Sequence, residues 1–445
     1  MKPITLKEVA ASCQGTLFGD ENLKITSIVT DSRKAGEGSL FAAIKGERVD
    51  GHDFIPKVKE QGAVCVLCEK KPDADIPYIL TDSTAIALKG IARYYRSLFS
   101  IPFVGITGSV GKTSTKELIY SVLKEKYNTH KTQGNFNNEL GVPLTLFGLE
   151  ESHEAAVIEM GISGFTEMTR LSKMVCPDIS VITNIGCCHL ENLKDRDGVL
   201  KAKTEMFQYL KEDGHIVLCG DDDKLSTIKE YNGIKPIFYG IDTDREYYAE
   251  DIEDNLLSGI DCVLCHGNVK IPVHIPAPGR HMVENALAAF AVGELLGLTP
   301  DEIKRGVESF KNVGSRNNII DNGSYIVIDD CYNANPTSVK AGLDTLAPVK
   351  GRTVAVLGDM KELGTDEISL HFEVGRYAKE KGINLLIAAG PLAKSLAEGY
   401  GDGAVYYETV DLACEKIKDL IQPDDTVLVK ASHSMHFEKI VEALK

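Results

Sequence analysis

Long apolar runs are missing from this sequence of 445 residues. The longest uninterrupted apolar stretch, residues 385–393, has nine residues, whereas a helix needs about 18 to span a membrane. The first residues also lack the apolar core of a secretion signal. We therefore expect a cytoplasmic protein with no membrane insertion.

Positive charge is scarce as well. The chain has 49 Lys and Arg against 65 Asp and Glu, and its formal net charge is −16. Binding along a nucleic-acid backbone requires clustered basic residues. We therefore expect no nucleic-acid partner, and any anionic ligand must be held by a local site.

Cysteine is too sparse for a disulfide scaffold, with 11 in the whole chain. Two pairs, Cys65/Cys68 and Cys262/Cys265, have the CxxC spacing of zinc sites. Both pairs lie in apolar runs typical of strands, where residues i and i+3 point to opposite faces. Packing is the favoured role of these cysteines, and zinc binding is the disfavoured alternative.

The composition that remains is that of a globular chain, with 43% hydrophobic and 26% charged residues. At about 150 residues per domain, this length favours three domains or two large ones. From about residue 98 onward, apolar strands alternate with helical patterns, which predicts parallel sheets covered on both faces. A helix at 282–296 closes the first series of strands, and a second series starts near residue 325.

The sequence therefore predicts an α/β protein of three domains. A small α/β domain occupies residues 1–97, and a central parallel-sheet domain occupies residues 98–313. A second doubly wound domain follows at 314–445.

The strongest motif is a phosphate-binding loop, TGSVGKT, at residues 107–113. It follows an apolar strand and opens a helix, so backbone N–H groups and the positive end of the helix converge on one point. Lys112 can reach the β and γ phosphates, and the Thr113 hydroxyl can bind Mg²⁺. Ile106 stands where the longer phosphate-loop pattern has its first glycine, so only the GxxGKT form is met. The predicted nucleotide contacts are Thr107, Gly108, Ser109, Val110, Gly111, Lys112, Thr113 and Ser114.

Three further residues follow the loop in order. Glu159 ends an apolar strand, at the edge where parallel sheets bind ligands, which suits a Mg²⁺ ligand as well as a helix cap. His189 follows the next strand, and Lys203 lies on the helix after it. Taken singly, His189 reads as a hydrogen-bonded structural residue and Lys203 as a solvated one.

In this order after a GxxGKT loop, a strand-end Glu, a strand-end His and a helix reading AKTEMF resemble the Mur ligase family. The resemblance covers essentially the whole chain. It implies an amino-terminal substrate-binding domain, a central P-loop ATPase domain and a carboxy-terminal Rossmann-like domain that closes over ATP.

Longer motifs narrow the resemblance within the family. Residues 30–54 resemble the signature of the members that bind UDP-MurNAc-dipeptide or UDP-MurNAc-tripeptide. Residues 134–146, 329–336 and 356–364 read GNFNNELGVPLTL, DDCYNANP and VLGDMKELG, and resemble the member that adds D-alanyl-D-alanine. The implied substrates are ATP, UDP-MurNAc-tripeptide and D-Ala-D-Ala, joined through an acyl phosphate. A monomer is expected.

The resemblance also implies roles for individual residues. The resemblance implies two Mg²⁺ ions, whose ligands are Thr113, Glu159, His189 and Lys203. Lys203 is implied to bind as a carbamate, formed by reaction of its amine with CO₂. Further nucleotide contacts are implied for Asn285, Arg316 and Asp330. The implied UDP-sugar contacts are Ser32, Arg33, Lys45 and His52. The peptide end is implied to meet Asn137, Asn138 and Thr183.

Two positions depart from the family pattern. Met282 replaces an Asn that packs against adenine, and His433 stands where Arg is usual, so neither contact is carried over. Arg316 has an alternative role as a hinge salt bridge.

Three other functions fit the sequence less well. A UDP-MurNAc-dipeptide ligase would show a DYAHTP-like run and, for diaminopimelate, a DNPR motif, and both are absent. A folylpolyglutamate synthase begins near the P-loop, without the motif at 30–54. A non-enzymatic P-loop switch would not need Glu159, His189 and Lys203 together.

Overall fold

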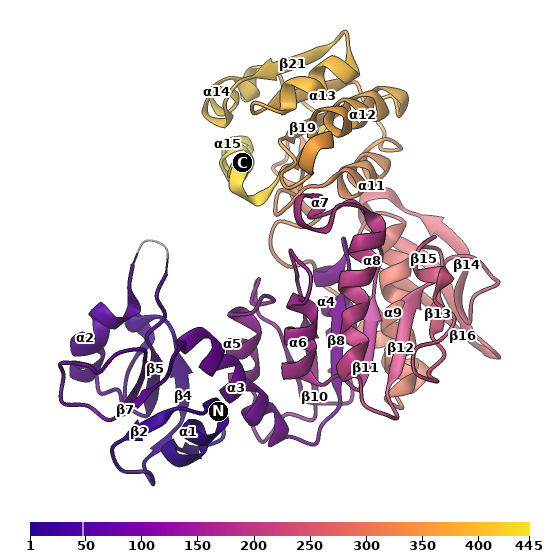
Figure 1. Ribbon diagram of the computed structural model, residues 1–445. Helices are drawn as coiled ribbons and strands as arrows, with labels where there is room; N and C mark the ends of the chain where they lie inside the picture. Colours follow the sequence, from indigo (N-terminus) through magenta and orange to yellow (C-terminus); the bar gives the residue numbers. More distant parts are fainter. Residues whose placement is uncertain (47–48) are drawn as a thin grey trace.

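The computed structural model describes residues 1–46 and 49–445 and shows three successive parts of the chain (Figure 1). The amino-terminal part and the carboxy-terminal part lie on different sides of the central part. In the described residues, no helix combines the length and the apolar character needed to cross a bilayer.

The amino-terminal part holds a five-stranded sheet, in the order β2-β7-β6-β5-β4, and a two-stranded sheet, β1-β3. Its strands are β1 (Ile4–Thr5), β2 (Thr16–Phe18), β3 (Lys24–Ile25), β4 (Ser27–Val29), β5 (Ser39–Ala42), β6 (Cys65–Cys68) and β7 (Tyr78–Leu80). Its helices are α1 (Leu6–Cys13), α2 (Ile55–Glu60) and α3 (Thr84–Ser97).

Helix α3 joins this part to the central one. The Ser83 hydroxyl caps its first turn by accepting from the Ile86 N–H. Near its end, the buried Tyr95 ring packs edge-on against Phe99 and Phe147, and its hydroxyl donates to the Leu149 carbonyl at 2.7 Å. The two parts consequently share one continuous apolar core.

The central part is a nine-stranded sheet in the order β16-β15-β14-β13-β12-β11-β8-β10-β9. Its strands are β8 (Phe103–Thr107), β9 (Thr129–Lys131), β10 (Ala155–Glu159), β11 (Ile179–Ile182), β12 (His215–Cys219), β13 (Ile237–Tyr239), β14 (Tyr247–Asp254), β15 (Ile260–His266) and β16 (Val269–Ile275). Strands β8 to β14 are parallel, as the sequence predicts, and β15 and β16 extend the sheet as antiparallel strands.

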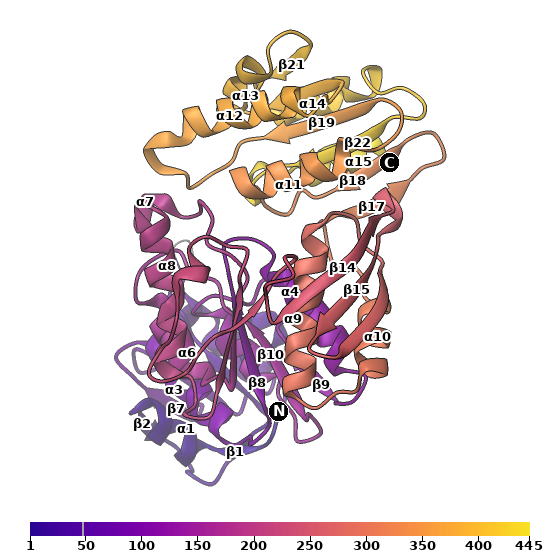
Figure 2. The same ribbon diagram turned by 90° about the vertical axis from the view of Figure 1, so that its right-hand side faces the viewer.

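Helices cover both faces of this sheet (Figure 2). The helices of the central part are α4 (Lys112–Leu123), α5 (Gly141–Phe147), α6 (Glu167–Val175), α7 (Leu190–Leu193), α8 (Arg196–Thr204), α9 (His281–Leu295) and α10 (Pro300–Glu308). From β8 the chain passes to β9 and β10 on one side and then to β11 on the other. The carboxyl end of β8 is therefore the switch point of the sheet, where open α/β sheets bind their ligands.

The carboxy-terminal part is a six-stranded sheet in the order β17-β18-β22-β19-β20-β21, parallel except for β17. Its strands are β17 (Asn318–Asp321), β18 (Ile326–Asp329), β19 (Thr353–Gly358), β20 (Leu385–Ala389), β21 (Ala404–Tyr407) and β22 (Thr426–Lys430). Its helices are α11 (Pro336–Leu346), α12 (Glu367–Glu380), α13 (Ala393–Tyr400), α14 (Val410–Lys416) and α15 (Glu438–Leu444).

Strand β19 shows why this sheet has helices on both faces. Ala355 and Leu357 point into the core made with α11, α12 and α13, whereas Val354 and Val356 point into the core made with α14 and α15. Apolar residues at every position of a strand bury both of its faces. The α/β class and the doubly wound carboxy-terminal domain predicted from the sequence are confirmed.

Candidate active site

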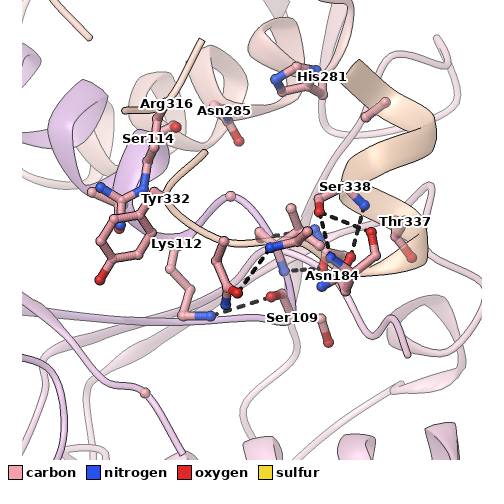
Figure 3. Close-up of a pocket in the computed structure, with 18 of the residues that line it drawn as sticks. Ser109, Lys112, Ser114, Asn184, His281, Asn285, Arg316, Tyr332, Thr337 and Ser338 are labelled. Carbon is pink, nitrogen blue, oxygen red and sulfur yellow. Dashed lines mark hydrogen bonds between the residues drawn. The ribbon is translucent and has the colours of Figure 1, made fainter. Parts of the chain in front are cut away.

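A cavity of about 580 Å³ lies between the central and the carboxy-terminal parts, within the size range of small-molecule sites. Its wall includes the loop after β8, the end of β10 and the start of α9. From the other part come the segment before β17, the residues after β18 and the start of α11. Figure 3 shows side chains from both parts around this space.

The loop between β8 and α4 is held by the loop that follows β11. The Ser109 N–H donates to the Asn184 carbonyl at 3.0 Å, and the Val110 N–H donates to Asn184 Oδ1 at 2.9 Å. Gly111 has φ +82°, a left-handed conformation that glycine adopts without strain. The loop is thus fixed just before the amino terminus of α4, which is the arrangement that binds phosphate.

Residues 109–114 of the predicted nucleotide loop line the cavity, whereas Thr107 and Gly108 lie behind it. Gly108 has no room for a side chain, because a Cβ there would lie 1.9 Å from Thr183 Oγ1. Thr183 is buried and donates its hydroxyl to the Val110 carbonyl at 2.6 Å. Thr183 therefore supports the phosphate loop from behind and is not part of the cavity wall, so its contact with a peptide stays a prediction.

Lys112 folds back over the loop. Its Nζ donates to the Gly108 carbonyl at 2.8 Å. It also donates to the Ser109 carbonyl at 3.4 Å, as Figure 3 shows. Among the described residues, no carboxylate lies within ion-pair distance of Lys112. Its ammonium is therefore available to an anion that enters the cavity.

Glu159, at the end of β10, is the centre of a buried polar cluster. Its Oε2 accepts from the Thr113 hydroxyl at 3.0 Å, and its Oε1 accepts from Asn137 Nδ2 at 2.8 Å. Only 2% of Glu159 is exposed. Thr113 and Glu159 were predicted as metal ligands and Asn137 as a contact to the peptide end, and the structure brings all three together.

Lys116 belongs to this cluster and was missed by the sequence analysis. Its Nζ lies 3.7 Å from Glu159 Oε2 and 3.2 Å from Glu117 Oε1, and it donates to the Thr132 carbonyl at 2.9 Å. A signal was present, because residue 116 lies one helical turn after Lys112 and shares its face of α4. The buried ammonium balances the charge of the Glu159 carboxylate.

His189 and Lys203 lie on the side of the cavity near α7 and α8. His189 lines the cavity, has φ +52°, and its Nδ1 lies 2.5 Å from Glu362 Oε2 in the carboxy-terminal part. Lys203 is 1% exposed and does not line the cavity. Burial, together with the charge of Lys112, lowers the pKa of Lys203 to about 8.

The carboxy-terminal part supplies the opposite wall. The Arg316 guanidinium lies 3.6 Å from the centre of the Tyr332 ring (Figure 3). Asp330 Oδ2 accepts from Lys430 Nζ at 2.5 Å. All four residues line the cavity. Tyr332 and Lys430 were not predicted, because their partners are distant in the sequence.

Asn285 connects α9 to the phosphate loop. Its Oδ1 accepts from the Thr115 hydroxyl at 2.9 Å, and its Nδ2 lies 3.4 Å from Met282 Sδ. Both Asn285 and Met282 line the cavity. The side chain of Met282 thus occupies the wall at the position where the sequence departs from the family pattern.

The four residues predicted to contact a UDP-sugar separate into two pairs. Ser32 and Arg33 line a second cavity of about 410 Å³ in the amino-terminal part, while Lys45 and His52 do not. His52 uses both ring nitrogens, since Nδ1 bonds Asp50 at 2.6 Å and Nε2 accepts from the Glu69 N–H at 2.9 Å. Asn137 and Asn138, predicted for the peptide end, line the larger cavity.

Models of known families match most of the chain. The Mur ligase middle domain matches residues 106–293, and the domain described as Mur ligase, glutamate ligase domain, matches residues 299–433. The domain described as Mur ligase family, catalytic domain, matches residues 24–96.

Similar proteins align over nearly the full length. A UDP-N-acetylmuramoyl-tripeptide--D-alanyl-D-alanine ligase from Bacillus subtilis is 35% identical, covering 99% of this chain and 98% of its own length. The crystal structure of MurF from Acinetobacter baumannii has a TM-score of 0.95 at 32% identity, over 100% of this chain and 99% of its own. The MurF ligase of Thermotoga maritima, solved in complex with ADP, has a TM-score of 0.84 at 28% identity, covering 94% and 96% of the two chains.

Proposed function

Because the chain belongs to the Mur ligase family, we propose that it is an ATP-dependent ligase that adds D-alanyl-D-alanine to UDP-MurNAc-tripeptide. The product is UDP-MurNAc-pentapeptide, a precursor of peptidoglycan. The observation that carries the proposal is the phosphate loop with Lys112 and Glu159, which faces Arg316 and Asp330 across one cavity.

ATP places its phosphates at the amino terminus of α4, against the N–H groups of the loop. Lys112 exchanges the carbonyls of Gly108 and Ser109 for phosphate oxygens. Arg316 adds positive charge from the carboxy-terminal part, and Asp330 binds the ribose hydroxyls. These residues reduce the repulsion between the triphosphate and the carboxylate that must approach it.

Magnesium suits the donors on the wall. Thr113 and Glu159 offer hard oxygen atoms 3.0 Å apart beside the phosphate loop. In the described residues, no three His, Cys, Asp or Glu side chains form a ready-made metal site, so phosphate oxygens must complete the coordination. When bound, Mg²⁺ neutralises phosphate charge. A second ion is assigned to Glu159 or His189 together with Lys203.

Lys203 is proposed to carry the carbamate. It is buried, its lowered pKa favours the neutral amine that attacks CO₂, and no acidic partner is within hydrogen-bonding distance among the described residues. The modified side chain would carry a carboxylate head, whose oxygen atoms could bind Mg²⁺.

The reaction that these residues support has two steps. The terminal carboxylate of the tripeptide attacks the γ phosphorus of ATP, which gives an acyl phosphate and ADP. The amine of D-Ala-D-Ala then attacks the acyl carbon, and phosphate leaves. Asn137 and Asn138 hold the peptide end, and Ser32 and Arg33 hold the UDP-sugar.

We also propose the division of the chain into domains at 1–97, 98–313 and 314–445, with a monomer as the working unit. The cavity supports the monomer, because residues of one chain line it on both sides. The cytoplasm is the proposed compartment, since both ATP and a UDP-linked substrate are made there.

Phosphate release is the direct test. ATP turnover should require UDP-MurNAc-tripeptide and D-Ala-D-Ala together, and omission of either should abolish it. Turnover that ignores D-Ala-D-Ala would refute this acceptor, and turnover with no muramyl peptide would refute the ligase assignment.

A further inference from the structure

Two loops from different parts of the chain meet beside the cavity. One leads from β11 to α7 and ends at His189, and the other leads from β19 to the short helix at Gly364–Asp366 and contains Glu362. Both His189, with φ +52°, and Glu362, with φ +63°, have a left-handed backbone. This conformation is unfavourable for a residue with a Cβ, so the surrounding structure must hold both residues in it.

The side chains of these two residues form the contact between the loops. His189 Nδ1 lies 2.5 Å from Glu362 Oε2, and their side chains are 24% and 57% exposed. This contact is an ion pair and not a hydrogen bond, since His189 Nδ1 has no hydrogen-bond partner among the described residues, and it lowers the pKa of Glu362. An ion pair this exposed adds little to the free energy of folding. Its main effect is therefore on the orientation of the His189 ring.

The backbones of the two loops also approach each other. A Cβ at Gly364 would lie 3.5 Å from the Glu191 N, and a Cβ at Gly186 would lie 3.1 Å from the Thr337 hydroxyl of α11. The loop that bears His189 is therefore packed against the carboxy-terminal part on both sides of the ring.

A carboxylate close to Nδ1 favours a proton on that nitrogen, opposes rotation of the imidazole and leaves Nε2 free. We infer that Glu362 is a positioning residue for the ligase reaction, which orients the His189 ring from the opposite part and completes the site only when the carboxy-terminal part is docked. Glu362 itself does not line the cavity, so it acts through His189. The inference rests on the proposed function.

A double-mutant cycle in the full chain tests this inference. Glu362→Ala should lower kcat about 10–100-fold, and Glu362→Gln should lose less, because its amide oxygen still lies beside Nδ1. KM for UDP-MurNAc-tripeptide should stay at the wild-type value, since that substrate binds largely elsewhere. In a His189→Ala background, Glu362→Ala should have no further effect on kcat.

Glu398→Gln is the matched control, because Glu398 is an exposed carboxylate of the same part, on α13. It should retain wild-type kcat, and thermal melting checks that every variant is folded. The role of Glu362 would be overturned if Glu362→Ala had the wild-type kcat. It would also be overturned if the decreases in kcat from His189→Ala and Glu362→Ala multiplied in the double variant. A wild-type enzyme that fails to turn over with both substrates would overturn the proposed function instead.

Discussion

Removal of CO₂ should inactivate this enzyme, and the environment of Lys203 gives the reason. The pKa of this buried lysine is lowered from 10.5 to about 8 by desolvation. At pH 7.5, about one amine in four is then neutral, against about one in a thousand for an ordinary lysine. Only the neutral amine reacts with CO₂, so burial raises the reactive population by about two orders of magnitude.

The assay compares enzyme stripped of CO₂ with the same enzyme after bicarbonate is added. Phosphate release should fall on stripping and return with bicarbonate. Lys203→Arg, which cannot form a carbamate, should lose at least about 100-fold in kcat and show no rescue. Lys201→Arg is the control, because Lys201 is exposed on the same helix.

Two results would refute this reasoning. Activity that ignores bicarbonate would show that the neutral amine is not carbamylated. A high-resolution structure with an unmodified Lys203 side chain in active enzyme would show the same, and the second metal would need other ligands.

Three further predictions follow from the same site. Lys112→Ala should lower kcat at least about 100-fold by removing the cation at the phosphate loop, as measured by phosphate release, and a threefold change would contradict the assignment. Small-angle scattering should show compaction on addition of a non-hydrolysable ATP analogue with the UDP-peptide, because Lys112 and Arg316 are proposed to contact one ligand from two parts. An unchanged radius of gyration at saturation would contradict closure. Lys116→Met should lower the free energy of unfolding, measured in urea, by about 3–5 kcal/mol, because it leaves the buried Glu159 carboxylate without its cation. Lys124→Met, at an exposed position, is the control and should leave the free energy of unfolding unchanged. Equal stability of the two variants would contradict the role of Lys116.

Local patterns in the sequence were enough to predict the architecture and the centre of the site. Apolar strands that alternate with helices specify a parallel sheet, and the carboxyl ends of its strands lie at one edge. Glu159 ends β10 and the phosphate loop follows β8, and these two strands are neighbours in the sheet, so both groups lie at the same place on that edge. The Thr113–Glu159 hydrogen bond forms because both residues lie at this edge of the sheet.

Contacts that depend on how the parts dock could not be predicted in this way. The pairing of Asp330 with Lys430 joins residues that are distant in sequence, and the contact of His189 with Glu362 joins two separate sheets. His52 was predicted to contact the UDP-sugar, but both of its ring nitrogens are hydrogen-bonded to residues of the amino-terminal part. Neither charge pattern nor periodicity carries information about such partners.

The most direct test of the central claim is the mass of the product. Enzyme, ATP and UDP-MurNAc-tripeptide should yield no new peptide, and addition of D-Ala-D-Ala should give UDP-MurNAc-pentapeptide together with one ADP and one phosphate. Formation of ADP with no pentapeptide, or a product that carries a different amino acid in place of the dipeptide, would contradict the assignment.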